Sequence, residues 1–137
     1  MSAQPKVNNF FEFVHLARPD PAVGIRIVKV TGDDPLGLNV AELGPHGSVT
    51  AHYHRAGSEI YQIVQGEGKL HTGVPASGDA VEWNTSVNVT SGDCFTVPEG
   101  QVHQLENTGS LPMIAIIVCP AAHIGHDRCI VAGAGPY

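Results

Sequence analysis

The chain has 137 residues, 42% of them hydrophobic, and a formal net charge of −6. This length fits one domain with a real apolar core. The negative charge argues against a nucleic-acid partner, since phosphates need a basic face, and no apolar run is long enough to cross a membrane. Residues 1–13 lack the apolar core of a signal peptide, so we expect a cytoplasmic protein. There are three cysteines, an odd number, and in a reducing compartment free thiols are the simplest state of Cys94, Cys119 and Cys129.

Turn signals divide the chain into many short segments, because 16 glycines and 10 prolines are spread along it. Residues 1–23 are expected to form an N-terminal arm, with at most one short turn near residues 10–16. From residue 24 onward, apolar and β-branched runs predict short strands. The expected strands cover residues 24–31, 38–43, 48–54, 59–65, 69–72, 80–83, 87–90, 94–97, 102–106 and 112–119. No helix is convincing between them, so residues 24–137 are predicted to be one all-β sandwich or barrel with a C-terminal tail.

Local sequence signals predict one hairpin and one central strand. Gly66-Glu67-Gly68 lies between two strands and predicts a hairpin that joins residues 59–65 to residues 69–72. The most apolar segment, residues 112–119, is predicted to be a buried central strand.

The stretch from His52 to Glu59 has the residue types of a metal site. His52 and His54 are two apart, so in a strand their side chains share a face. Residues 55–58 form a turn, and Glu59 opens the next strand, which we expect to pair beside the histidines. Three ligands from one hairpin-like unit can then meet at one point.

A fourth ligand is offered by His103, which follows the corner Pro98-Glu99-Gly100. Three imidazoles and one carboxylate suit one divalent ion of iron, manganese, nickel or zinc. Four protein ligands on a six-coordinate ion leave two positions for water or substrate, and an open site of this kind is typical of chemistry.

These two stretches resemble the two motifs of the cupin superfamily. Residues 52–66 are similar to the first motif, and Gly92 through Asn107 match the second motif at every fixed position. The resemblance implies a double-stranded β-helix, also called a jelly-roll barrel, and a metal held by His52, His54, Glu59 and His103.

Strand alternation predicts further residues around the metal. Tyr61 shares the face of Glu59, so its hydroxyl should reach the cavity and could hold or protonate a substrate. Gln101 shares the face of His103 and is a candidate pocket group. His71 is expected across the predicted hairpin from the strand of Tyr61, pointing into the barrel. Arg55 lies at the barrel mouth, and a solvated surface position is the expected one.

The tail resembles a second, narrower group. Residues 118–127, from Val118 through Cys119-Pro120-Ala121-Ala122 to Gly125-His126-Asp127, are similar to the segment after the last strand of archaeal-type cupin phosphoglucose isomerases. The likeness implies that His126 approaches the active site and acts with Glu59 and Tyr61 as a catalytic residue. Arg128 stands where that family has a tyrosine.

The function predicted on these grounds is a metal-dependent sugar or sugar-phosphate isomerase acting on a small-molecule substrate. An Fe(II)-dependent dioxygenase or another small-molecule lyase is the first alternative, and a non-catalytic metabolite-binding protein is the second. A homodimer is also expected, since exposed sheet edges and the outward apolar positions Ile60 and Val64 invite pairing.

Overall fold

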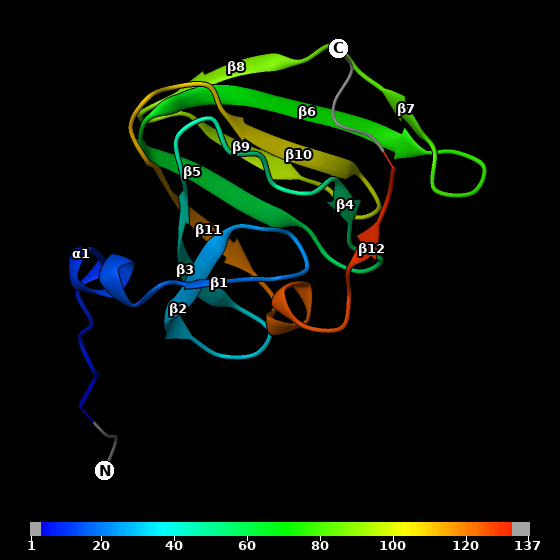
Figure 1. Cartoon of the computed structure of the whole chain (residues 1–137). Coiled ribbons are helices and arrows are strands. Elements are labelled where there is room, and N and C mark those ends of the chain that lie inside the picture. Colours follow the sequence, from blue (N-terminus) through cyan, green and yellow to red (C-terminus); the bar gives the residue numbers. More distant parts are fainter. Residues whose placement is uncertain (1–3, 133–137) are drawn as a thin grey trace.

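The computed structural model describes residues 4–132, and nearly half of this part of the chain forms strands that curl into two facing sheets (Figure 1). The elements are α1 (Phe10–Phe13), η1 (Val14–Leu16), β1 (Arg18–Pro19), β2 (Arg26–Gly32), β3 (Gly37–Leu43), β4 (His52–Tyr53), β5 (Glu59–Gln65), β6 (Glu67–Pro75), β7 (Val81–Trp83), β8 (Val87–Thr90), β9 (Cys94–Val97), β10 (Val102–Asn107), β11 (Met113–Cys119), η2 (Ala121–Ile124) and β12 (Cys129–Ile130).

The strands pair into two antiparallel sheets. The first sheet has the order β1-β2-β3-β11-β5-β9, and the second has the order β12-β4-β10-β6-β7, with β8 also paired to β6. Their inner faces enclose the core, which is the layered arrangement of a jelly roll. The all-β fold predicted from the sequence is confirmed, and β11 is central, between β3 and β5.

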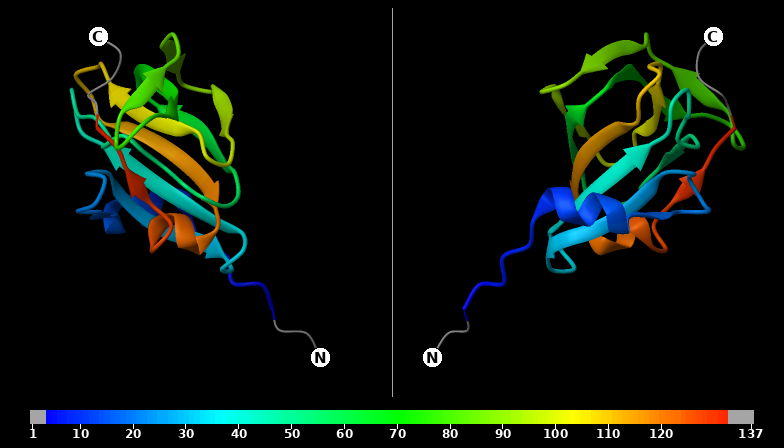
Figure 2. Two further views of the ribbon diagram at one scale, coloured as in Figure 1. Left: turned by 90° about the vertical axis from the view of Figure 1, so that its right-hand side faces the viewer. Right: turned by 60° about the vertical axis from the view of Figure 1, so that its left-hand side comes forward.

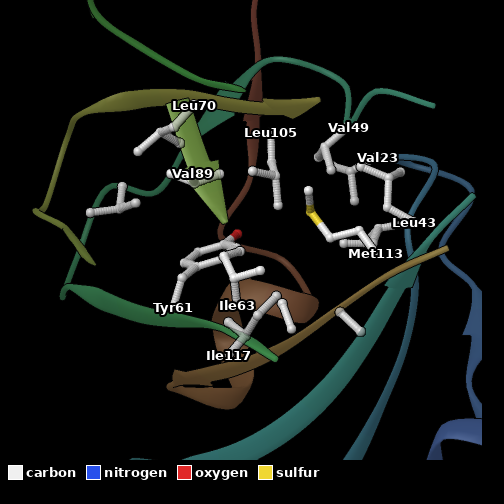
Figure 3. Packing of buried hydrophobic residues seen from close by; sticks show 14 of the residues in the cluster. Val23, Leu43, Val49, Tyr61, Ile63, Leu70, Val89, Leu105, Met113 and Ile117 are labelled. Atoms are coloured by element: carbon white, nitrogen blue, oxygen red, sulfur yellow. The ribbon is translucent and has the colours of Figure 1, made fainter. Parts of the chain in front are cut away.

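Side-chain alternation explains which residues fill the barrel. In β5 the buried residues Glu59, Tyr61 and Ile63 alternate with Ile60 and Gln62, which are exposed. The same period runs through β11, where every second residue is buried. Figure 3 shows the result: Tyr61, Ile63 and Ile117 of the first sheet lie opposite Leu70 and Leu105 of the second. The inner face of β5 therefore carries both core residues and the carboxylate of Glu59.

The predicted hairpin between β5 and β6 is wrong. These strands belong to different sheets, and the chain crosses from one sheet to the other at residues 66–68. Gly66 has a φ of 103°, a left-handed conformation that favours glycine. A Cβ on Gly68 would overlap the carbonyl oxygen of Glu106, so no side chain fits there. The two glycines form a corner between layers, which from the sequence alone has the same signature as a hairpin turn.

The ends of the chain add to the barrel more than was expected. The arm holds the short turn predicted near residues 10–16, as α1 and η1, which lie outside the first sheet (Figure 2). The strand β1 also falls within residues 1–23 and pairs with β2. In the tail, η2 covers one end of the barrel, and β12 pairs with β4. The strand expected over residues 48–54 is shorter than predicted, since only His52–Tyr53 is regular.

None of the helices in residues 4–132 is long and apolar enough to span a bilayer. On the outer face of β5, Ile60 is 49% exposed and Val64 is half-buried, as the alternation predicts. The homodimer stays a prediction.

Candidate metal centre

The three histidines of the two motifs come together on the inner face of the second sheet. His52 on β4 and His103 on β10 are direct cross-strand partners, and His54 follows two residues after His52. All three side chains are buried. One ring nitrogen from each lies within 4.8 Å of those of the other two, which is close enough to share one ion.

Glu59 reaches this group from the opposite sheet. Its Oε1 atom lies 3.2 Å from Nε2 of His54 and 3.2 Å from Nε2 of His103. The prediction that the strand of Glu59 pairs beside the histidines is wrong, because β5 pairs with β11 and β9 whereas β4 pairs with β10 and β12. The four groups meet because the two sheets face each other across the barrel, and their positions depend on the whole fold.

Backbone carbonyls fix the orientation of each ring. In all three histidines Nδ1 faces a main-chain carbonyl oxygen. For His52 and His103 this oxygen belongs to the residue two positions earlier, and for His54 it belongs to the C-terminal tail. The partners are Thr50 for His52 at 2.7 Å, Asp127 for His54 at 2.6 Å and Gln101 for His103 at 3.3 Å. A carbonyl oxygen only accepts, so Nδ1 carries the hydrogen and the Nε2 lone pair faces the centre. Gln101, expected to contribute from its side chain, acts here through its carbonyl.

This donor set fits a divalent cation. The Nε2 atoms of His54 and His103 are buried and have no hydrogen-bond partner among residues 4–132. In the tautomer just described, both lone pairs face a carboxylate oxygen, an arrangement that a cation between them relieves. Burial and the neighbouring His103 lower the pKa of His52 to about 3, so its ring is neutral. Burial alone would raise the pKa of Glu59, but the surrounding histidines hold it well below its usual range.

Tyr61 lies where the alternation of β5 predicts. It is buried, its ring stacks on Phe95 with a centroid separation of 5.0 Å, and its hydroxyl is 3.5 Å from Oε1 of Glu59. Figure 3 shows the hydroxyl oxygen inside the barrel. Burial and the charge of Glu59 raise the pKa of Tyr61 well above its usual value. The hydroxyl therefore stays protonated, and it donates its hydrogen to Oε1 of Glu59.

His126 does not join this cluster. Its side chain is exposed and borders a surface hollow shared with Arg55 and Asp127, so its expected approach to the metal ligands is not observed. The tail instead brings His123, on η2, into the barrel. His123 is buried, with Nδ1 3.2 Å from Oε2 of Glu59 and Nε2 2.6 Å from the carbonyl of Ala56. The tail has no period that would have pointed to this residue.

His123 is placed to hold Glu59, not to share its ion with His54. The rings of His123 and His54 are stacked, with centroids 3.9 Å apart and an angle of 3° between planes. An imidazole binds a metal through a lone pair in its own plane, and two parallel planes have no point in common. Burial lowers the pKa of His123, but hydrogen bonds to Glu59 and Ala56 outweigh it and raise the pKa overall. A protonated Nδ1 can thus donate to Oε2 and orient the carboxylate.

Replacing His123 by glutamine should weaken metal binding without abolishing it. Partners that orient a ligand typically contribute about 10-fold to 100-fold to metal affinity. Competition against a chelator should show this loss, while the number of ions bound at saturation stays unchanged. The His126→Gln variant is the control and should match the parent protein. Loss of the full metal complement in His123→Gln would instead make His123 a ligand.

Three of the ligand candidates, His52, His54 and Glu59, border a small cavity of about 30 Å³, close to the space of one water molecule. Apolar side chains form most of the remaining wall, namely Val23, Ile25, Ile27, Val49, Ile117 and Ile124. Asp20 and Arg128 complete the lining, and their side chains form an ion pair of 2.6 Å.

Two other sequence expectations are decided by the fold. His71 is buried, but it lies on the face of β6 opposite to the core residue Leu70, with Nδ1 2.7 Å from the hydroxyl of Ser86. Its predicted place inside the barrel, across a hairpin, is therefore wrong. The three cysteines are free, as expected, and burial together with Glu59 raises the pKa of the Cys119 thiol to about 12.

Comparison with known proteins agrees with this fold. The family model described as "Cupin domain" matches residues 39–119. A putative germin-like protein 2-1 of Oryza sativa subsp. japonica is 30% identical over 124 residues, which cover 85% of this chain and 56% of that protein. The oxalate-binding protein of Thermotoga maritima is 36% identical over 80 residues, 56% of this chain and 57% of that one. This chain thus spans about half the length of these curated relatives.

Among solved structures, a double-stranded β-helix domain protein of Klebsiella pneumoniae superposes with a TM-score of 0.65 at 19% identity, covering 95% of this chain and all of that one. This likeness supports the fold.

Proposed function

This chain belongs to the cupin family, and from this premise we propose that it binds one divalent metal ion and uses it to bind a small carboxylate metabolite. The protein ligands would be His52, His54, His103 and Glu59. Iron, manganese, nickel and zinc are all compatible with three imidazoles and one carboxylate.

The observation that supports the metal site best is the convergence of three buried imidazoles on the carboxylate of Glu59 inside the barrel. When bound, a divalent ion supplies a Lewis acid that attracts and polarises oxygen ligands. The chain's own groups would do the rest. Glu59 stays ionised as a ligand, His123 orients it, and the Tyr61 hydroxyl, which lines the cavity, donates a hydrogen bond to it.

Size and charge favour a small anion as the ligand. The cavity beside the ligands is about 30 Å³, far below the roughly 300 Å³ at which pockets for larger ligands begin. A divalent ion exceeds the single negative charge of Glu59, so the loaded centre attracts an anion. The Thermotoga maritima relative is named as an oxalate-binding protein, which agrees with a small dicarboxylate.

The sugar or sugar-phosphate isomerase has less support. The tail residue that carried this likeness, His126, is exposed and lies outside the cluster of metal-ligand candidates. A small carboxylate ligand is compatible with the other predicted functions. A lyase would decarboxylate it, an Fe(II)-dependent dioxygenase would oxidise it, and a metabolite-binding protein would bind it without turnover.

Calorimetric titration with oxalate tests the proposal directly. Metal-loaded protein should bind oxalate, while metal-free protein and a loaded sample treated with chelator should not. Glucose 6-phosphate serves as the comparison ligand and should bind neither form. Equal oxalate binding with and without metal, or isomerisation of the sugar phosphate, would contradict the proposal. Carbon dioxide release and dioxygen uptake by the loaded protein then separate the lyase, the oxygenase and the binding protein.

A further inference from the structure

An arginine from the tail lines the same cavity as the metal ligands. Arg128 follows η2, and its guanidinium meets the carboxylate of Asp20, which comes from the turn between β1 and β2. Nη1 of Arg128 donates to Oδ1 of Asp20 at 2.6 Å. The Arg128 side chain is 10% exposed and that of Asp20 is 9% exposed. A mostly buried ion pair thus forms part of the cavity wall, although its partners are distant in sequence.

The guanidinium has more donors than the pair uses. Nη2 donates to the carbonyl of Ile124, whereas Nε is buried and has no hydrogen-bond partner among residues 4–132. A buried N–H group without an acceptor is unfavourable, and a guanidinium offers its donors in a fork that matches a carboxylate. An incoming carboxylate could satisfy Nε, which shares its edge of the guanidinium with Nη2.

Asp20 does not depend on Arg128 for its position. Its Oδ1 atom also accepts from the backbone N–H of Ala22 at 3.1 Å, and its own N–H donates to the carbonyl of Ile25 at 2.7 Å. The turn therefore holds Asp20 when the arginine changes partner. The Asp20 carboxylate therefore pairs with Arg128 when no ligand is bound, and the carboxylate of a ligand can take its place on the guanidinium.

We propose that Arg128 is the anion-recognition residue of the cavity and binds the carboxylate of the metal's ligand in exchange for Asp20. This inference rests on the proposed function, since it assumes a small carboxylate as the ligand. It explains how a cavity of about 30 Å³ admits such a molecule, because breaking the Asp20–Arg128 pair opens the cavity at the point where the anion binds. It also assigns a use to the residue that departs from the isomerase pattern.

The test is oxalate titration of metal-loaded variants, with metal content measured for each. Arg128→Gln should bind oxalate at least 10-fold more weakly, since it loses the charged partner of the carboxylate and its hydrogen bonds. Asp20→Asn should bind oxalate several-fold more tightly, because it loses the competing charge but keeps the oxygen that Ala22 uses. Arg55→Gln removes the same charge from an exposed position and should leave affinity unchanged.

Each outcome decides a separate point. If Arg128→Gln holds its metal and binds oxalate like the parent, the role of Arg128 is overturned and the proposed function stands. If the metal-loaded parent protein binds no oxalate, the carboxylate function fails and this inference with it. If Arg128→Gln does not fold, Asp20→Asn decides, and unchanged or weaker oxalate binding by that variant would overturn the exchange.

Discussion

Alanine in place of His54 should reduce the metal content of the purified protein from a full complement to almost none. His54 lies beside both other histidines and the carboxylate: its ligand nitrogen is within 4.8 Å of those of His52 and His103, and its Nε2 is 3.2 Å from Oε1 of Glu59. Its Nε2 atom has no other hydrogen-bond partner among the described residues, so the substitution removes a donor that nothing nearby replaces. Elemental analysis after dialysis against a metal-buffered solution measures the effect.

The matched control is His126→Ala, which removes the same side chain from an exposed place on the same tail as His123. It should keep the full metal content, and circular dichroism should show both variants folded. Full metal content in His54→Ala would refute the assignment of this centre. Loss of metal in His126→Ala would return that residue to the site.

Asn107→Ala should destabilise the fold by about 3 kcal/mol, because it leaves several buried backbone groups without partners. Asn107 ends the second motif and is fully buried. Its Nδ2 atom lies 3.0 Å from the carbonyl of Leu43, 3.0 Å from that of Gly44 and 2.8 Å from that of Leu111. Its Oδ1 accepts from the N–H of Gly109 at 2.9 Å. Urea unfolding of the metal-free protein gives the difference in free energy.

Asn84→Ala is the comparison for that measurement. The Asn84 amide also donates a hydrogen bond, to the hydroxyl of Thr72, but in an exposed position where water can replace it. Its free energy of unfolding should stay within about 0.5 kcal/mol of the parent value. Equal effects of the two substitutions would contradict a structural role for the motif asparagine. Asn107 also illustrates that a motif position can serve the fold and not the chemistry.

Local sequence patterns determined most strand positions and the direction of several side chains. The period of two in residues 59–65 predicted both the strand β5 and the inward side chains of Glu59 and Tyr61, because a strand's alternation depends only on neighbouring residues. The spacing of His52 and His54 placed both rings on one face for the same reason. The short strands β8 and β9 coincide with the predicted residues 87–90 and 94–97, since turn residues bound them on both sides.

The tertiary structure decided which strands face each other and what the tail adds. Gly66 and Gly68 have the signature of a hairpin, yet they turn the chain from one sheet to the other, so that the apolar faces of both strands meet in one core. That crossing sets Glu59 opposite the histidines. Likewise, η2 has no periodicity to predict it, and only its packing on the barrel end brings His123 to Glu59 and leaves His126 in solvent. The sequence by itself identified the four ligand candidates, because their spacing is local. The places of His123 and Arg128 beside these ligands could not be predicted from the sequence, because both residues reach the cavity through contacts between segments far apart in the chain.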